Sequence, residues 1–275
     1  MRLAVRHVTT YRYEPPPVRV ALRLRLWPTD FDGQRAEGWQ VAVNGDPVAP
    51  FSTDSWGQAV GLWQAGDPGE GIEITASGQV LTEDRAGVVS GLPMRPPEGV
   101  FLRTTPLTEA SDAVVEFAAA IPEQDRLSWL HALCRAVGEA VVYRPQVTGN
   151  ATSAAEALQL GAGVCQDQTH LFIAAARSKG IPARNVVGYL LAEDGSAAEV
   201  ETHAWAEAAV PGLGWVGFDP THTICPTDRF VRLGCGLDSH DAAPVQGVVI
   251  GQSTVSVAAR VAIGAEDDGQ AQEQQ

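Results

Sequence analysis

The sequence has few basic residues, few cysteines and no long apolar run. Its 275 residues include 19 lysines and arginines against 33 aspartates and glutamates, so the formal net charge is -14. An acidic surface repels phosphate backbones and anionic lipids. The only accumulation of basic residues is a set of scattered arginines between Arg19 and Arg25. We therefore expect neither a nucleic-acid partner nor a membrane-surface partner.

Signals for membrane insertion and secretion are also missing. No segment approaches the roughly 18 consecutive apolar residues of a spanning helix. The first residues alternate in polarity like a strand and lack the apolar core of a signal peptide. We therefore expect a cytoplasmic protein, in which cysteines stay free thiols by default. There are four: Cys134, Cys165, Cys225 and Cys235.

Hydrophobic residues make up 45% of the chain, enough for a core, and their pattern changes near residue 100. Before it, apolar and polar residues alternate with period two, as in residues 3–8 and 18–26, which is typical of strands. Asn44-Gly45-Asp46 predicts a hairpin turn, because Asn-Gly tolerates positive φ. Residues 1–100 are predicted to form an N-terminal β-sandwich-like domain.

After a stretch rich in proline and glycine, residues 101–263 are predicted to form a second, α+β domain. Helical spacing covers residues 108–120 and 125–142. A capping box at Ser153 and Glu156 begins a short helix, and another helix spans residues 164–179. Strands follow at 183–192, 201–210 and 215–219, the last two as a hairpin. Residues 223–263 are predicted as loops with a last strand at 253–263, and 264–275 as a disordered acidic tail.

Cys165 differs from the other cysteines by its position. It begins the helix that follows Gly161-Ala162-Gly163. A helix N-terminus favours an anion, so it lowers the pKa of a thiol from about 8.5. The same position offers backbone N–H groups, including that of Cys165, to an oxyanion. This is the environment of a nucleophilic thiolate.

A histidine and an acidic residue on neighbouring strands complete the pattern. His203, Trp205 and Glu207 share one face of their strand, and Asp219 shares a face with Trp215 across the hairpin. If the register joins these faces, Asp219 accepts the Nδ1–H of His203. A Cys165–His203–Asp219 triad is then geometrically available.

Several separated segments resemble the bacterial transglutaminase-like superfamily. They are GAGVCQD at 161–167, GIPAR at 180–184 with Gly188-Tyr189, THAW at 202–205, GWVGFDPT at 214–221, and Tyr143-Arg144-Pro145 with Thr148. The resemblance implies a papain-related α+β core, in which a Cys helix packs on an antiparallel sheet, and the triad Cys165, His203 and Asp219. Residues 1–100 are similar to the β-rich N-terminal region that many members carry.

The resemblance also implies an activity. Members are often labelled cysteine proteases rather than protein cross-linkers, so we expect hydrolysis of peptide or carboxamide bonds in a protein or peptide substrate. Glutamine-directed transfer to an amine and a non-catalytic binding module remain alternatives. Residues Tyr143, Gln166 and Trp205 are further candidates for the oxyanion or substrate site. No cofactor is expected, and no calcium-loop pattern is present.

Some residues depart from the family pattern, and others are predicted to have structural or alternative roles. His222 stands where relatives commonly have Asn, and Leu237 and Ser239 where they usually have Arg and Tyr. Asp167 is predicted to cap its helix and His170 to pack from it. Glu207 is predicted to pair with an arginine such as Arg184. A rival hypothesis is a zinc site formed by His222, Cys225, Cys235 and His240, although the spacings fit no common zinc module.

Overall fold

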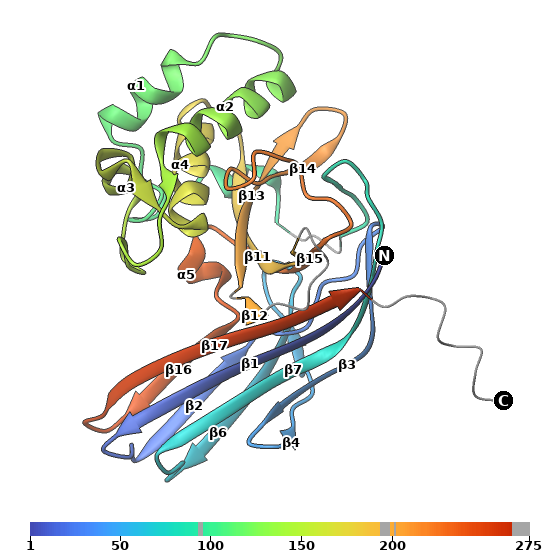
Figure 1. The fold of residues 1–275 in the computed structure, drawn as a ribbon, viewed down its shortest axis with the longest axis vertical. Coiled ribbons are helices and arrows are strands. Elements are labelled where there is room, and N and C mark those ends of the chain that lie inside the picture. The colour runs from blue at the N-terminus through green and yellow to red at the C-terminus, as the bar shows by residue number, and fades with distance from the viewer. Residues whose placement is uncertain (93–95, 193–198, 201, 266–275) are drawn as a thin grey trace, which may run out of the picture.

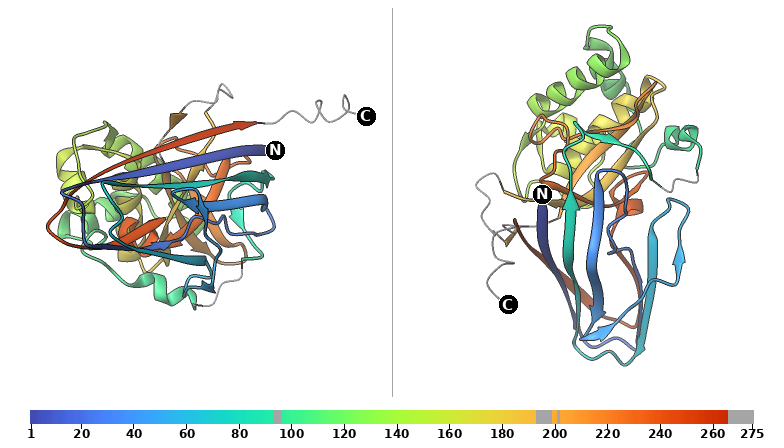
Figure 2. Two further views of the ribbon diagram at one scale, coloured as in Figure 1. Left: turned by 90° about the horizontal axis from the view of Figure 1, so that it is seen from below. Right: turned by 90° about the vertical axis from the view of Figure 1, so that its right-hand side faces the viewer.

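The computed structural model describes residues 1–92, 96–192, 199–200 and 202–265. It is a mixed α+β structure with a long β-sandwich at one end and helices gathered at the other (Figures 1 and 2). Within the described residues, no helix has the length and apolar content that crossing a bilayer requires.

Two sheets form the sandwich. The first is six-stranded, and the second four-stranded. A buried cluster fills the space between them, with Val20, Leu24, Val43 and Ile74 among its members. In order across the first sheet the strands are β12 (Glu199–Val200), β17 (Thr254–Ala265), β1 (Arg2–Glu14), β7 (Gly71–Thr82), β3 (Gln34–Val43) and β4 (Asp46–Pro47); across the second they are β16 (Val245–Ile250), β2 (Arg19–Leu24), β6 (Ala59–Gly66) and β5 (Ser52–Thr53).

The C-terminal strands return to this sandwich, which corrects the assignment of residues up to 263 to the second domain. β17 pairs antiparallel with β1 along its whole length, and β16 pairs with β2. The predicted tail also begins later, because Gly264 and Ala265 pair with Ala4 and Leu3; the remainder of it lies outside the described residues. The predicted hairpin is present, with positive φ at Asn44 and Gly45.

Outside the sandwich, the rest of the described chain is built around a five-stranded sheet, and helices cover one face of this sheet (Figure 1). Its strands in order are β15 (Phe230–Gly236), β11 (Ala183–Leu190), β13 (His203–Val210), β14 (Gly214–Phe218) and β8 (Val88–Val89). The helices are η1 (Glu98–Leu102), α1 (Asp112–Ala120), α2 (Arg126–Ala140), α3 (Ala154–Leu160), α4 (Cys165–Ser178) and α5 (Ser239–Ala242).

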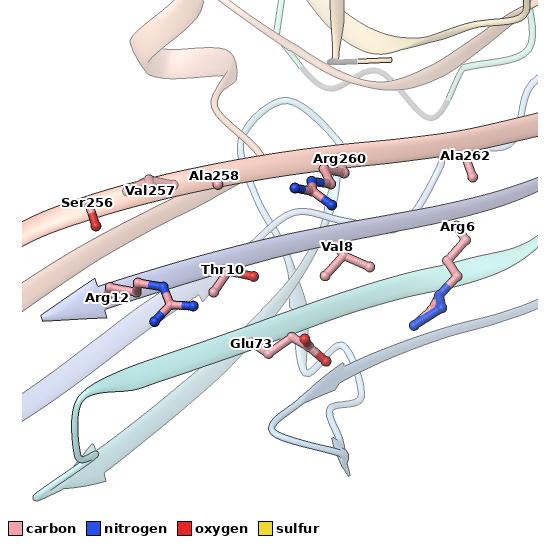
Figure 3. Close-up of a pocket in the computed structure, with 10 residues that line it drawn as sticks. All are labelled: Arg6, Val8, Thr10, Arg12, Glu73, Ser256, Val257, Ala258, Arg260 and Ala262. Atoms are coloured by element: carbon pink, nitrogen blue, oxygen red, sulfur yellow. The ribbon is translucent and has the colours of Figure 1, made fainter. Parts of the chain in front are cut away.

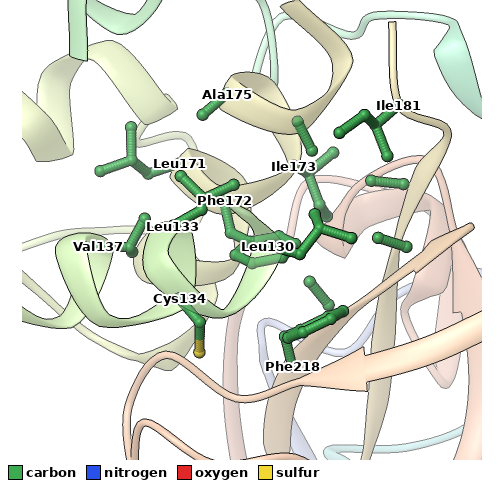
Figure 4. Packing of buried hydrophobic residues seen from close by; sticks show 14 of the residues in the cluster. Leu130, Leu133, Cys134, Val137, Leu171, Phe172, Ile173, Ala175, Ile181 and Phe218 are labelled. Carbon is green, nitrogen blue, oxygen red and sulfur yellow. The ribbon is translucent and has the colours of Figure 1, made fainter. Parts of the chain in front are cut away.

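Helix α4 is the centre of this core. Leu171, Phe172 and Ile173 are fully buried in one cluster with residues of α2 and the sheet, and Phe172 stacks on Phe218 (Figure 4). Ala206 and Ala208 of β13 are buried in the same cluster. Their small side chains let the helix approach the sheet closely, as the alternation of alanines on this strand predicts.

Helix starts follow their caps. The helix predicted from residue 108 begins at Asp112, because the Ser111 side chain accepts the N–H of Val114. The capping box of Ser153 and Glu156 is present. Residues 223–263 contain more structure than predicted, namely β15, α5 and β16. Every residue of β15 is buried, so the strand lacks the alternation that would reveal it.

The sandwich and the five-stranded sheet share a buried hydrophobic cluster. Leu3 and Val5 of the sandwich pack with Tyr189 and Val231 of the central sheet. Side chains of the N-terminal part also bond to the outer edge of β15. Gln34 donates to the carbonyl of Arg232 and accepts its N–H, and Gln58 donates to the carbonyl of Cys235. This edge is thereby covered, as buried backbone groups require.

Gly188 allows β11 and β15 to approach at a register shift. A Cβ there would lie 2.0 Å from the carbonyl oxygen of Val231 and 2.6 Å from the Trp205 ring. We expect Gly188→Ala to lower the free energy of unfolding by about 1–3 kcal/mol through overpacking, measured by urea denaturation. Gly66→Ala is the matched strand control, because a Cβ at Gly66 meets nothing within 4 Å. Equal stability of both variants would contradict this explanation.

Candidate active site

Cys165 is the first residue of α4, and its surroundings leave the helix N-terminus open. The N-cap residue Val164 has an apolar side chain, which cannot occupy the first N–H groups of the helix. Asp167, a buried residue, accepts the N–H of Val164 at 2.7 Å and the hydroxyl of Thr148 at 2.6 Å. Its predicted capping role is thus confirmed, and it leaves the N–H groups of residues 165 and 166 for a ligand.

The glycine turn before Cys165 has a steric reason. Gly161 ends α3 with a φ of 66°, a conformation that favours glycine. A Cβ at Gly163 would lie 2.6 Å from the Asp167 carboxylate. Residues 162–163 (β10) pair in parallel with Val142–Tyr143 (β9), so Gly163 lies opposite Tyr143. The turn therefore brings Tyr143 beside the start of α4.

The hairpin of β13 and β14 brings Asp219 beside His203. Glu207 lies opposite Gly217, so the two faces meet in the predicted register. The bond itself differs from the prediction: His203 Nε2, rather than Nδ1, lies 2.8 Å from Asp219 Oδ2. The Cys165 side chain is the other neighbour that raises the pKa of His203. Since Nε2 faces Asp219, Nδ1 is the ring nitrogen left for the thiol.

Charge interactions within the site shift two pKa values. Burial alone would lower the pKa of His203, but the hydrogen bonds to Asp219 and Cys165 and their negative charges raise it to about 10. Burial would raise the pKa of Asp219, which is fully buried, but His203 and His222 lower it to about 2. The arrangement therefore favours a charged His203 imidazolium beside an ionised Asp219 carboxylate.

The His203 ring rests on aromatic side chains. Trp205 stacks with it at 6.1 Å between ring centroids, and Phe230 lies 6.0 Å away. Trp205 is itself buried and absent from the residues that line the cavity at Cys165. Its suggested contact with substrate is therefore not supported; it holds the His203 ring in place instead.

Three residues around Asp219 were missed as site residues by sequence reasoning. Thr221 donates its N–H to Asp219 Oδ1 and its hydroxyl to Gln168 on α4, and Gln168 donates to the carbonyl of Val141. His222 Nδ1 lies 2.7 Å from Asp219 Oδ2. Only His222 carried a sequence signal, as a departure from the family pattern; Gln168 and Thr221 depend on long-range contacts.

A cavity of about 870 Å³ opens at the thiol. Cys165, His203 and His222 line it together with the suggested site residues Tyr143 and Gln166. A second hollow, of about 700 Å³, lies on the outer face of the long sheet among Arg6, Arg12, Arg260 and Glu73 (Figure 3). No cysteine or histidine lines that second hollow, so the nucleophile candidates are confined to the first.

The rival zinc set is not assembled. In the part of the chain that the structure describes, His203, Asp219 and His222 are the only three potential ligands whose donor atoms lie within 4.8 Å of one another. Cys235 is buried next to Gln58, on β15. The predicted pairing of Glu207 with Arg184 is confirmed at 2.5 Å, and Arg232 joins it at 2.8 Å.

Two family models match the chain. The transglutaminase-like superfamily model matches residues 115–220, and the model of the bacterial transglutaminase-like N-terminal region matches residues 3–81. The uncharacterized protein ML0607 of Mycobacterium leprae is 30% identical over 279 residues, covering 93% of this chain and 96% of that protein. The uncharacterized protein Rv2569c of Mycobacterium tuberculosis is 29% identical, covering 93% and 90%. The chain belongs to the transglutaminase-like superfamily.

A solved structure supports the same fold. A crystal structure titled "Putative Cysteine Protease from Cytophaga hutchinsonii" superposes with a TM-score of 0.76 and 22% identity, covering 97% of this chain and 92% of that one. At this identity the likeness concerns the fold alone. It extends over the sandwich and the core together, so the whole α+β arrangement has a counterpart among solved structures.

Proposed function

We propose that the protein is a thiol-dependent hydrolase of peptide or carboxamide bonds, with Cys165 as nucleophile, His203 as acid and base, and Asp219 as the group that orients His203. The observation that carries this proposal is the position of His203, which is hydrogen-bonded to Asp219 at 2.8 Å and lines the same 870 Å³ cavity as Cys165. A protein or peptide segment is the proposed substrate.

The reaction follows from this geometry. The Cys165 thiolate attacks the carbonyl carbon, and the oxyanion that forms is held by N–H groups at the start of α4. His203 gives its proton to the departing amine, which leaves a thioester on Cys165. His203 then takes a proton from water, the hydroxide attacks the thioester, and the acid and free thiolate are released. The scheme needs no cofactor.

Residues around Cys165 and His203 have supporting roles in the proposed reaction. Asp219 remains ionised throughout, because its pKa is lowered to about 2 by His203 and His222 against the effect of burial. Trp205 and Phe230 limit rotation of the His203 ring. Tyr143 and Gln166 line the cavity, which supports the proposal that they contact the substrate carbonyl or its flanks.

Amine transfer is the second candidate. The same thioester can be attacked by an amine instead of water, and the open cavity offers room for one. A peptide containing glutamine, incubated with a fluorescent primary amine, separates the outcomes: transfer attaches the amine, whereas hydrolysis leaves a carboxylate. A non-catalytic binding module would produce neither product and no acyl adduct on Cys165.

Selective alkylation tests the nucleophile directly. With limiting iodoacetamide at pH 6, we expect Cys165 to be modified well before the other three thiols, as measured by peptide mass spectrometry. Burial raises the pKa of Cys134 to about 12 and that of Cys225 to about 11, and Cys235 is only 1% exposed. Slow and uniform labelling of all four cysteines would refute the proposed function.

A further inference from the structure

Asp219 contacts two histidines, His203 and His222, and the proposed mechanism uses only His203. His203 Nε2 and His222 Nδ1 lie 2.8 and 2.7 Å from the same carboxylate oxygen. The two rings meet edge to face at 5.4 Å between centroids. The His222 side chain is 40% exposed and lines the cavity at Cys165, whereas Asp219 is fully buried.

These three donor atoms have the chemistry and spacing of a zinc site. Zinc binds imidazole nitrogen and carboxylate oxygen at about 2.0–2.2 Å, and three such protein ligands with an open fourth position are a common arrangement. Ligand atoms around a tetrahedral ion lie about 3.4 Å apart. The present separations of 2.8 and 2.7 Å must therefore widen by about 0.6–0.7 Å. The exposed His222 side chain has the freedom to move. Thr221 holds the other carboxylate oxygen at 2.9 Å, as outer groups commonly do around a metal.

We propose that His203, Asp219 and His222 form a Zn²⁺ site that inhibits the enzyme. Zn²⁺ takes the place of the protons that Asp219 shares with the two rings, and these protons pass to solvent. With Nε2 bound to the metal, His203 can no longer cycle between imidazole and imidazolium. Both proton transfers of the thioester cycle then stop, so this regulatory consequence rests on the proposed function, although metal binding itself does not.

Calorimetric titration of the metal-free protein with Zn²⁺ tests the site. We expect one equivalent to bind, and His222→Asn to weaken the affinity at least ~10-fold. His240→Asn is the matched control, because His240 is an exposed histidine outside the cavity. Cys165→Ser should retain binding, which separates this site from a thiol–imidazole one. Co²⁺ in place of Zn²⁺ should give visible absorption bands without charge transfer from a thiolate.

The outcomes are distinct. Absence of binding by the wild-type protein overturns the inference, as does unchanged affinity in His222→Asn or loss of binding in Cys165→Ser. Loss of binding in His240→Asn also overturns it, because His240 lies outside the proposed ligand set. Selective alkylation of Cys165, measured with a chelator present, tests the proposed function separately from the metal site.

Discussion

Replacing His203 with alanine should slow the alkylation of Cys165 at pH 6 by about 100-fold. A free cysteine thiol has a pKa of about 8.5, so only about 0.3% of it is thiolate at pH 6. The variant lacks the imidazolium that favours a thiolate at this position. In the wild-type protein, His203 is hydrogen-bonded to Asp219, and the Cys165 side chain helps to raise the pKa of His203. The labelling rate of both proteins, measured by mass spectrometry, gives the ratio directly.

The pH dependence distinguishes activation from mere accessibility. The pKa of His203 is raised to about 10 by Asp219 and Cys165 against the opposing effect of burial. A raised pKa means that the charged ring contributes stability fully below its unfolded value near 6.5, and that this contribution is lost as the pH rises through about 10. Since His203 stays charged between pH 6 and 8, wild-type labelling should rise less steeply with pH than that of His203→Ala, which should gain about tenfold per pH unit, as an ordinary thiol does.

His131→Asn provides the control for loss of a histidine elsewhere, because His131 is exposed on α2. It should label like the wild type. Identical pH profiles for wild type and His203→Ala would show that the helix N-terminus alone activates the thiol, and the triad would then be discarded.

Replacing Glu207 with glutamine should have the largest effect on stability, lowering the free energy of unfolding by about 3–5 kcal/mol. Glu207 is fully buried between Arg184, at 2.5 Å, and Arg232, at 2.8 Å. Glutamine keeps the shape but removes the negative charge that lies between two buried guanidinium groups. Guanidinium chloride or thermal unfolding followed by circular dichroism measures the loss.

A surface cluster offers the matched control. Glu37 also contacts two arginines, Arg35 at 2.6 Å and Arg2 at 3.1 Å, but all three side chains are partly or largely exposed. Solvent screens such pairs, so Glu37→Gln should unfold close to the wild type. Equal destabilisation by both substitutions would show that burial does not determine the strength of these pairs.

The loss of stability at low pH provides a second test of the buried Glu207 carboxylate. Burial would raise the pKa of Glu207, but Arg184 and Arg232 lower it to about 2. A lowered pKa means that its contribution is present above the unfolded value near 4.5 and is lost as the pH falls through about 2. The wild type should therefore lose more stability than Glu207→Gln when the pH is lowered from 5 to 2.

Local patterns in the sequence were sufficient for the elements that carry the candidate triad. The glycine turn before Cys165 predicts a helix start, and the alternation around His203 predicts which side chains share a face with Asp219. These features depend on backbone conformation over a few residues, and the structure contains them at nearly the predicted bounds. The α+β class followed from the same local signals, strengthened by the family resemblance.

Contacts between distant residues were decided only by tertiary structure. The pairing of β17 with β1 joins the two ends of the described chain, and no local period encodes which strand a β-strand will join. The same holds for the Thr221–Gln168 bond and for the ring nitrogen that His203 turns to Asp219. The sequence by itself therefore determined that a thiol, an imidazole and a carboxylate stand at the ends of suitable elements. The packing of helix on sheet decided their orientation and placed His222 as a second partner of Asp219, because these depend on contacts between residues far apart in the chain.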